Sequence, residues 1–591
     1  MQRNLLVTNF RGTIHLLLGL LACVLLPDRL LLFAEERVTT QEPLHADQIY
    51  DPNHIVEVIV ELKAEDWLSL CGQSRGLLQA LGQHSSTKPF TYFRANVTID
   101  GRKINNVGVR KKGFLGSLDS TRPSLKIKFD EFVDQQPSVG FDRLTLNNNK
   151  QDPSRLSQYL SYKIFNESGT VASRCNFARV TVNGKYLGIY SNVEPIKPPF
   201  LARRFGDNSG ALFEGTVVDF DPDSVERFEK KNDAAKFEYV RELAEIMDRD
   251  QFTLEELGEV LDIQAFIKFW ATESLIGFWD GYTNNQNNFF VYRHPATKKF
   301  YFIPWGVDSA FADSVPLSQF KAEVKSVHSK SILANRLYYR PEIQKLYFKT
   351  INQLLEDHWQ EDALIAEVEK AVDLLKKHIL PANRRFDRAV ANVKAFIRGR
   401  RATIEKDLQG GVAKITKGAR RAMSLKVIGS ATGTFSTQWS ETSPRKPTET
   451  GAAQLKVVFA GKPIEFGILG VTAEPGKDKN NREANGRMPP SIVFHGRRKS
   501  NNQPWMMTLA TNSESFHTSL EPAPVNGIVI EGNPLWFFAK MMMSRDKLGN
   551  LILVGGTVTF DKAKRETGAP VIGTVKVDFA AFQGGDHMPR R

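Results

Sequence analysis

Cysteine is scarce in this chain, which has three such residues among 591. Cys23 lies in the apolar N-terminal segment, so Cys71 and Cys175 remain for the rest of the protein. So few cysteines exclude a disulfide scaffold and a cysteine-based metal site. The sequence leaves open whether Cys71 and Cys175 form one disulfide or stay as two buried thiols.

The N-terminus lacks a hydrophobic run long enough to span a bilayer. The apolar run from Ile14 to Leu26 is too short for a membrane-spanning helix and has the length of a signal-peptide core. Residues 20–23, Leu-Leu-Ala-Cys, also resemble a bacterial lipoprotein site. We therefore expect residues 1–34 to be a signal peptide or lipoprotein-type leader. Export to the periplasm, cell surface or medium is expected, with a bacterial envelope favoured and membrane association only through this leader or a lipid anchor.

Basic residues are not clustered, although the formal net charge is +13. The sequence has no zinc-finger, RRM or KH pattern, so nucleic acid is not an expected partner. A generally basic surface suits small anionic ligands such as nucleotides.

The first half of the chain is rich in predicted strands, and the second half in predicted helices. Asp100-Gly101 and Asn183-Gly184 are strong hairpin signals. Strands are predicted at 55–62, 93–99, 104–110, 124–129 and on both sides of Asn183-Gly184. Helices are predicted at 154–165, 263–278, 332–355, 363–375 and 386–408. This order predicts an α+β fold with a strand-rich N-lobe and a helical C-lobe.

A change in composition after Gly410-Gly411 predicts a second domain. Short β runs separated by Gly, Pro and Asn follow, as in all-β sandwiches and barrels. We therefore expect a catalytic-type domain at 48–410 and an accessory β-sandwich or barrel domain at 411–591.

Asp280 and Asp308 bracket a polar stretch of unusual composition. Asp280 follows a predicted apolar helix, four asparagines follow within eight positions, and a predicted hairpin leads to Asp308. Carboxylate and amide oxygens suit Mg²⁺, and an unligated Asp can accept a proton from a nucleophile. Asn and Asp also favour turns, so an ordinary Asn-rich turn remains an equally valid interpretation.

A phosphate-binding region is predicted in the N-lobe. Gly113, Gly116 and Ser117 form a loop whose backbone N–H groups could face phosphates. Lys126 in a predicted strand could hold a phosphate and pair with Glu194. Lys128 lies on the same face as Lys126, so periodicity does not choose between them. From spacing alone, plain turns and ordinary surface charges explain these residues better.

Five segments together resemble the spore coat protein H (CotH) family, whose members are secreted, atypical protein kinases with a distant kinase-like fold. In chain order these segments are residues 107–113, 124–129, 182–194, 280–292 and 303–308. The resemblance runs from about residue 55 to residue 408 and implies ATP and Mg²⁺ (or Mn²⁺) as cofactors.

The resemblance also implies roles for individual residues. Asp280 would be the catalytic carboxylate. Asp308 would bind the metal, assisted by Asn285 or Asn288. Lys126 would hold the phosphates, oriented by Glu194. Arg110 and the loop of Gly113, Gly116 and Ser117 would cover the triphosphate.

One position departs from the family pattern. The family usually has Trp-Asp-x-Asp where this chain has Trp305-Gly306-Val307-Asp308. The resemblance therefore implies an exported kinase that phosphorylates Ser or Thr of secreted or envelope proteins, or else an inactive pseudokinase or structural surface protein. A carbohydrate-active protein using two carboxylates is a weaker third hypothesis.

Overall fold

The computed structural model describes residues 42–73, 75–81, 90–312, 321–322, 324–379, 384–409, 411–477, 488–512, 515–519, 521–533, 537 and 551–584. The predicted leader, residues 1–34, lies outside these ranges. The chain divides into Met1–Glu42 and a compact unit, Pro43–Arg591. Among the described residues, no helix combines the length and apolar character needed to cross a bilayer.

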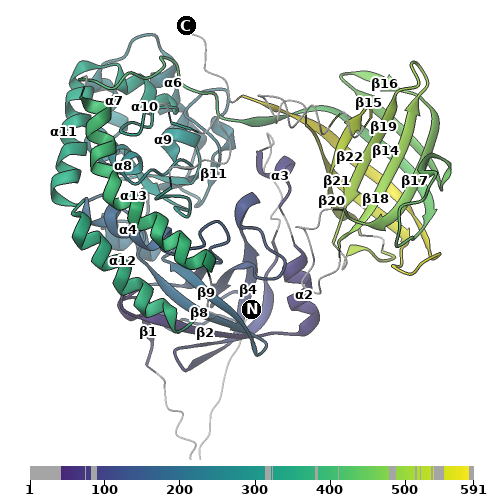
Figure 1. The fold of residues 1–591 in the computed structure, drawn as a ribbon, viewed down its shortest axis with the longest axis horizontal. Helices are drawn as coiled ribbons and strands as arrows, with labels where there is room; N and C mark the ends of the chain where they lie inside the picture. Colours follow the sequence, from purple (N-terminus) through teal and green to yellow (C-terminus); the bar gives the residue numbers. More distant parts are fainter. Residues whose placement is uncertain are drawn as a thin grey trace, which may run out of the picture. The chain divides into compact units, whose positions relative to one another are not determined.

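The N-terminal part of the compact unit is a closed β-barrel (Figure 1). Its strands, in barrel order, are β2 (Ile55–Glu61), β3 (Phe93–Ile99), β4 (Arg102–Lys112), β5 (Ser124–Lys128), β7 (Arg143–Asn147), β9 (Lys185–Val193) and β8 (Cys175–Val182). Alternate residues of β2 point inward, where Val56, Val58 and Val60 are fully buried. Both predicted hairpin turns are present, since the strands on either side of each turn are paired. Asp100 and Asn183 adopt positive φ beside their glycines.

Short elements complete this lobe. They are α1 (Ala46–Ile49), α2 (Ala64–Gly72), α3 (Leu77–Leu81), the 3₁₀ turn η1 (Leu115–Ser117), and the parallel pair β1 (Leu44–His45) and β6 (Ser138–Val139). Cys71 and Cys175 are both buried as free thiols, which decides between the two alternatives in favour of thiols.

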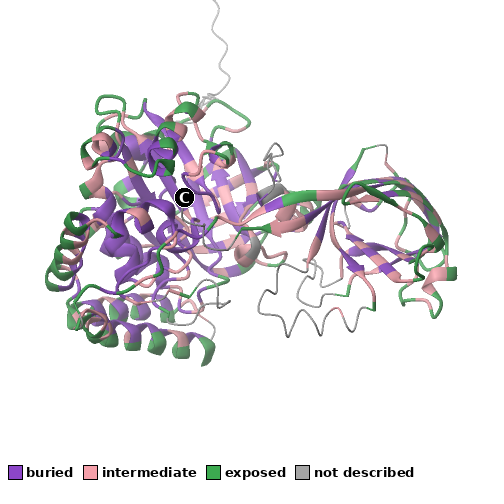
Figure 2. Cartoon of the chain, turned by 90° about the horizontal axis from the view of Figure 1, so that it is seen from above, coloured by how far each residue is buried: buried purple, intermediate pink, exposed green. Residues whose placement is uncertain are grey.

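The following part is mainly helical. Its helices are α4 (Ser157–Glu167), α5 (Pro198–Phe205), α6 (Phe237–Asp248), α7 (Leu254–Val260), α8 (Ile263–Leu275), α9 (Tyr282–Asn285), α10 (Ile332–Tyr338), α11 (Pro341–Asp357), α12 (Glu361–Lys376) and α13 (Arg384–Leu408). A small sheet has the order β11 (Glu229–Lys230), β10 (Ala211–Gly215), β12 (Phe289–Arg293) and β13 (Phe300–Pro304). The 3₁₀ turn η2 (Val225–Arg227) precedes β11. Outer helices bury one face and expose the other (Figure 2).

Helix α8 is the central helix of this lobe. The Asp262 side chain caps its first turn by accepting a hydrogen bond from Ala265 N at 3.0 Å. Phe266, Phe269 and Trp270 are buried, and the helix packs against α11 and β13. A helix fixed in this way gives the chain after it a rigid starting point.

The C-terminal part is all-β, as predicted. Its nine-stranded antiparallel sheet has the order β16-β15-β14-β22-β21-β20-β19-β18-β17. In chain order the strands are β14 (Ser424–Gln438), β15 (Ala452–Phe459), β16 (Lys462–Ile464), β17 (Phe466–Pro475), β18 (Pro490–Arg498), β19 (Pro504–Ala510), β20 (Ala523–Glu531), β21 (Ile552–Lys562) and β22 (Pro570–Gln583), with the 3₁₀ turn η4 (Pro447–Glu449). Phe435, Trp505 and Phe560 contribute to its own hydrophobic core. The α+β prediction with an added β domain is therefore confirmed.

Candidate functional site

Asp280 follows α8 and precedes the short helix α9. Gly281 permits this tight passage, because a Cβ atom there would lie 2.4 Å from Glu273 Oε1. Three amides donate to the Asp280 carboxylate: Asn285 Nδ2 at 2.6 Å, Asn287 Nδ2 at 3.1 Å and Asn288 Nδ2 at 2.8 Å. Burial raises the pKa of Asp280, and the three amides act in the opposite direction. The asparagines therefore hold one carboxylate in a fixed orientation.

Asp308 lies four residues after β13 and is 8% exposed. Burial raises its pKa to about 7, and the negative charge of Asp280 adds to this rise. Lys112 and Asp152 also act on Asp308, Lys112 lowering its pKa and Asp152 raising it. The fold thus brings Asp280 and Asp308 close enough for their charges to interact.

Asp152 is a carboxylate near this site whose proximity to Asp308 the sequence did not indicate. It accepts hydrogen bonds from Ser154 N at 2.9 Å and Ser157 N at 2.8 Å at the start of α4. Helix α4 begins at Ser157, three residues later than the sequence predicted.

The barrel contributes a cluster of cations next to the carboxylates. Arg110 and Lys112 share one face of β4, and Arg110 is paired in register with Lys126 of β5. The Lys112 ammonium lies 6.0 Å from the ring centroid of Trp305, which comes just before Asp308 in the chain. Burial lowers the pKa of Lys112 to about 8, while Asp308 acts to raise it. Lys112 is not among the site residues predicted from the sequence, although its alternation with Arg110 along one strand was a usable signal.

Lys126 is the centre of this cationic cluster. Burial lowers its pKa well below the usual value, and the charges of Arg110 and Lys231 lower it further. The negative charge of Glu214 in β10 acts to raise the pKa of Lys126. Glu214 Oε2 also forms an ion pair with Lys231 Nζ at 2.7 Å. Burial alone would raise the pKa of Glu214, but Lys231 and Lys126 hold it at about 2. Closely spaced cations repel one another, so the cluster suits a bound anion.

The predicted partnership of Lys126 with Glu194 is not what the structure contains. Glu194 is 2% exposed, and its carboxylate binds Arg174 at 2.8 Å and Arg203 at 2.5 Å. Glu214 is the carboxylate that acts on Lys126. Its position as the one charged residue in the otherwise apolar strand β10 is the sequence signal that could have identified it.

The ambiguity between Lys126 and Lys128 is resolved by their neighbours. Lys128 forms ion pairs with Glu131 at 2.9 Å and Asp130 at 3.6 Å. The Lys128 ammonium is thus paired with carboxylates two and three residues away in the chain. Lys126 instead belongs to the cationic cluster that contains Lys112.

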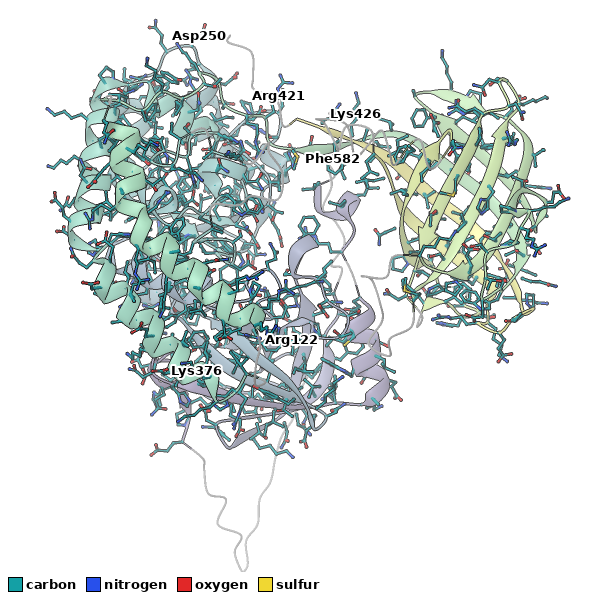
Figure 3. All side chains as sticks on the ribbon, in the orientation of Figure 1. Arg122, Asp250, Lys376, Arg421, Lys426 and Phe582 are labelled. Atoms are coloured by element: carbon teal, nitrogen blue, oxygen red, sulfur yellow. The ribbon has the colours of Figure 1, made fainter. Side chains whose placement is uncertain are left out.

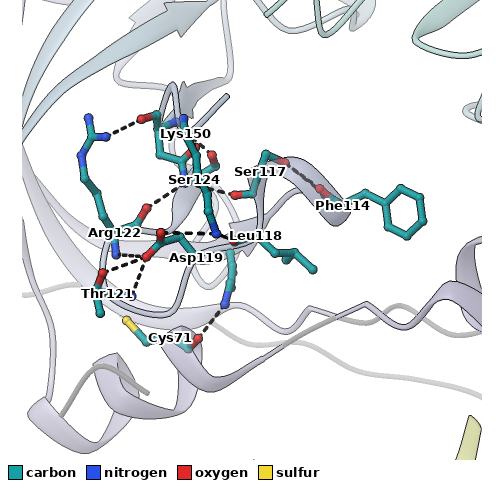
Figure 4. Close-up of polar contacts among 11 residues, drawn as sticks. Cys71, Phe114, Ser117, Leu118, Asp119, Thr121, Arg122, Ser124 and Lys150 are labelled. Atoms are coloured by element: carbon teal, nitrogen blue, oxygen red, sulfur yellow. Dashed lines mark hydrogen bonds and ion pairs between the residues drawn. The ribbon is translucent and has the colours of Figure 1, made fainter. Parts of the chain in front are cut away.

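The loop of Gly113, Gly116 and Ser117 is a compact 3₁₀ turn. Ser117 Oγ accepts from Phe114 N and donates to Phe114 O, both at 3.1 Å (Figure 4). Gly113 has φ +119°, and a Cβ there would lie 2.6 Å from Ser117 Oγ. The Ser117 hydroxyl therefore closes its own turn, which differs from an open phosphate-binding loop.

Arg122 holds the chain that follows this turn. Arg122 is labelled in Figures 3 and 4. Its guanidinium donates to the backbone carbonyls of Leu187 at 2.7 Å and Asn148 at 2.5 Å. Asp119 Oδ1 in turn accepts from Arg122 N at 2.8 Å. The turn thus has a fixed position relative to β9.

Asn285 and Asn288 present their amide groups differently. Asn285 Oδ1 accepts from Arg420 at 2.6 Å, so the oxygen that a metal ion would need is already engaged. This contact is at odds with a metal-ligand role for Asn285. Asn288 Oδ1 lies toward Gly306, where an added Cβ would be 2.8 Å away. Asn288 is therefore the better candidate for a second oxygen ligand beside Asp308.

The barrel places a buried hydroxyl beside Lys126. Thr145 Oγ1 is buried without a hydrogen-bond partner, and Thr145 is paired in register with Lys126. In the described part of the chain, no group of three or more His, Cys, Asp or Glu side chains could hold a metal ion. Mg²⁺ commonly uses one or two carboxylates and takes its other ligands from phosphate and water. The residues present therefore fit Mg²⁺ held jointly with a phosphate-bearing ligand.

One protein family matches the part of the chain that contains this site. A family model described as CotH kinase protein matches residues 109–404, which include Lys126, Asp280 and Asp308. The chain is 25% identical over 287 residues to the inner spore coat protein H of Bacillus subtilis, covering 44% of this chain and 77% of that protein.

Two fungal proteins from Rhizopus delemar are also similar. Spore coat protein homolog 1 is 24% identical over 230 residues, covering 34% of this chain and 36% of that protein. Invasin CotH2 is 24% identical over 196 residues, covering 30% of this chain and 33% of that protein. The chain therefore covers about a third of the length of each of these two relatives.

Proposed function

This chain belongs to the CotH kinase family, and from this membership and the geometry of the site we propose that it is an exported, atypical protein kinase. It transfers the γ-phosphate of ATP to Ser or Thr hydroxyls of secreted or envelope proteins. The observation that carries the proposal is the placement of Asp308, whose charge interacts with both Asp280 and Lys112. The Lys112 ammonium lies 6.0 Å from the ring centroid of Trp305, three residues before Asp308. Phosphoryl transfer needs this combination of carboxylates and cations, because catalysis is mainly positioning and charge stabilisation.

Each residue has a specific task in this reaction. Asp280 orients the acceptor hydroxyl and takes its proton as the hydroxyl oxygen forms a bond to the γ-phosphorus. The bond from the γ-phosphorus to the β–γ bridging oxygen breaks, and ADP leaves with that oxygen. Lys126 and Lys112 offset the negative charge of the phosphates, and Arg110 lies beside them. Asn285, Asn287 and Asn288 hold Asp280 in position.

Asp308 and Asn288 are the residues that would hold Mg²⁺ (or Mn²⁺). When bound, the metal ion would offset charge on the phosphate oxygens. Gly306 supports the alternative that the protein is a pseudokinase or a structural surface protein, since the family usually has an acid there. The retained carboxylates at 280 and 308 favour the active form.

Export is part of this proposal. Relatives named spore coat protein H and invasin CotH2 support a location at a surface or outside the cell. The apolar segment near the N-terminus supports the same conclusion.

Direct measurement of phosphate transfer tests the proposed function. The purified protein is incubated with γ-³²P-labelled ATP and Mg²⁺ or Mn²⁺, with dephosphorylated casein as acceptor. We expect label in phosphoserine or phosphothreonine of casein or of the protein itself. Nucleotide binding without any transfer would replace the kinase proposal with the pseudokinase alternative.

Replacing Gly306 by Asp is expected to increase Mg²⁺ affinity about tenfold, because it adds a carboxylate beside Asn288 and near Asp308. Gly306 has φ +56°, a conformation that Asp and Asn tolerate better than most residues. Gly306→Asn is therefore the matched control, with the same shape and no charge. Isothermal titration calorimetry with Mg²⁺ and a non-hydrolysable ATP analogue measures the difference. Equal affinities for the two variants would mean that residue 306 does not face the ion.

A further inference from the structure

Arg420 lies outside the residues matched by the family model but contacts the loop that carries Asp280. The chain that follows α13 packs Ala413 and Ala419 into the core of the helical lobe. Arg420 comes directly after Ala419 and is 2% exposed. An arginine is costly to bury, so its contacts indicate why it is there.

The Arg420 guanidinium binds two neighbouring side-chain amides. It donates to Asn285 Oδ1 at 2.6 Å and to Gln286 Oε1 at 2.5 Å. The backbone is tied to the same loop, since Gln286 Nε2 donates to Arg420 O at 2.9 Å and to Lys330 O at 3.0 Å. Arg420 N donates to Lys330 O at 2.8 Å. The contact therefore has several fixed points on both sides.

These bonds determine which end of the Asn285 amide faces Asp280. An amide has one acceptor oxygen and one donor nitrogen on opposite sides. Because Arg420 can only donate, it takes the oxygen, and Nδ2 is left to donate to Asp280 at 2.6 Å. An Asn285 rotated the other way would put its oxygen against the carboxylate.

We propose that Arg420 is a positioning residue of the phosphotransfer site, which orients the Asn285 amide and through it the Asp280 carboxylate. This inference rests on the proposed function for its effect on rate. The orientation of the Asn285 amide is a structural effect that can be measured without activity. The segment after α13 is thereby part of the catalytic unit, although the family match ends at residue 404.

The charge distribution around Arg420 agrees with this role. Burial lowers the pKa of Arg420 to about 10, while the charges of Asp219 and Asp280 act to raise it. Asp219 accepts hydrogen bonds from Tyr282 Oη and Ile332 N, both at 2.8 Å. Arg420 thus lies in the field of both carboxylates while it bonds to the amides.

The kinetic test uses Arg420→Met, which keeps the length of the side chain without its donors, and Arg420→Lys, which keeps one charged donor group. We expect Arg420→Met to lower kcat about 10- to 100-fold, with KM for ATP changed less than about twofold. Arg420→Lys should restore part of the loss. Arg421→Met is the matched control, because Arg421 is exposed and is the next residue in the chain (Figure 3). Unchanged kcat in Arg420→Met, or a rise in KM alone, would overturn the proposal.

The structural test uses the full chain without nucleotide, with ¹⁵N-labelled asparagine side chains. Asn285→Ser identifies the Asn285 amide signal by its loss. We expect this signal to be shifted downfield and slow to exchange in the wild type, and to lose both properties in Arg420→Met. If Arg420→Met does not fold, Arg420→Lys carries the same measurement with a smaller change expected. An unchanged Asn285 signal would overturn the positioning role even where kcat falls.

The two tests separate this inference from the proposed function. Absence of phosphate transfer by the wild type contradicts the kinase proposal, whereas the amide signal still decides whether Arg420 orients Asn285.

Discussion

Replacing Asp280 by Asn is expected to lower the rate of phosphate transfer about 10³-fold while changing the affinity for Mg²⁺–ATP less than about twofold. Asn cannot take the proton of the acceptor hydroxyl. Asp280 is hydrogen-bonded to Asn285, Asn287 and Asn288, and Asp308 is the carboxylate assigned to the metal. The loss should therefore appear in kcat and not in nucleotide binding. Initial rates with γ-³²P-labelled ATP and calorimetry with a non-hydrolysable analogue measure the two quantities.

The matched control for this substitution is Asp262→Asn. Asp262 caps α8, the helix that precedes Asp280, and Asn is an equally good N-cap residue. The control should therefore retain both activity and stability. Equal rates for wild type and Asp280→Asn would show that Asp280 does not accept the proton. A parallel loss of rate in Asp262→Asn would trace the effect to α8 instead.

Much of the fold could be predicted because it follows from local rules. Asp100 and Asn183 adopt the positive φ that tight hairpins require, next to glycine. Strand β5 alternates as expected, with Leu125 and Ile127 buried. These features depend on residues that are neighbours in sequence, so a single sequence contains the necessary information.

The charge partners could not be predicted in the same way. Glu214 belongs to β10, which lies in a different sheet from β4 and β5. Folding brings its carboxylate close enough to Lys126 for the two charges to interact. Glu194 follows β9 and lies close to Arg174 and Arg203 instead. Glu194 follows a strand and Glu214 lies in one, so their sequence positions are similar. Only the three-dimensional arrangement shows which of them interacts with Lys126.

Asn285 illustrates a different difficulty. An amide oxygen suits a metal ion, but the Asn285 oxygen accepts a hydrogen bond from Arg420, which lies 135 positions later in the chain. No local pattern connects Asn285 with Arg420, and the change in composition after Gly411 favoured assigning Arg420 to another domain. The candidate carboxylates were identifiable from the sequence, whereas the residues that orient them were not.

Replacing Asp308 by Asn is expected to weaken Mg²⁺-dependent nucleotide binding about 100-fold, which corresponds to about 2.7 kcal/mol. Asp308 lies close to Lys112 and Asp280, so it is the carboxylate best placed to share a cation with phosphates held by the barrel. Removing its charge leaves Lys112 and Lys126 to bind the nucleotide alone. Calorimetry in Mg²⁺ and in EDTA provides the internal control, because the affinity measured in EDTA should be nearly the same for wild type and variant. The same dependence on Mg²⁺ in both proteins would contradict the metal-binding role of Asp308 and favour a purely structural one at the end of the hairpin.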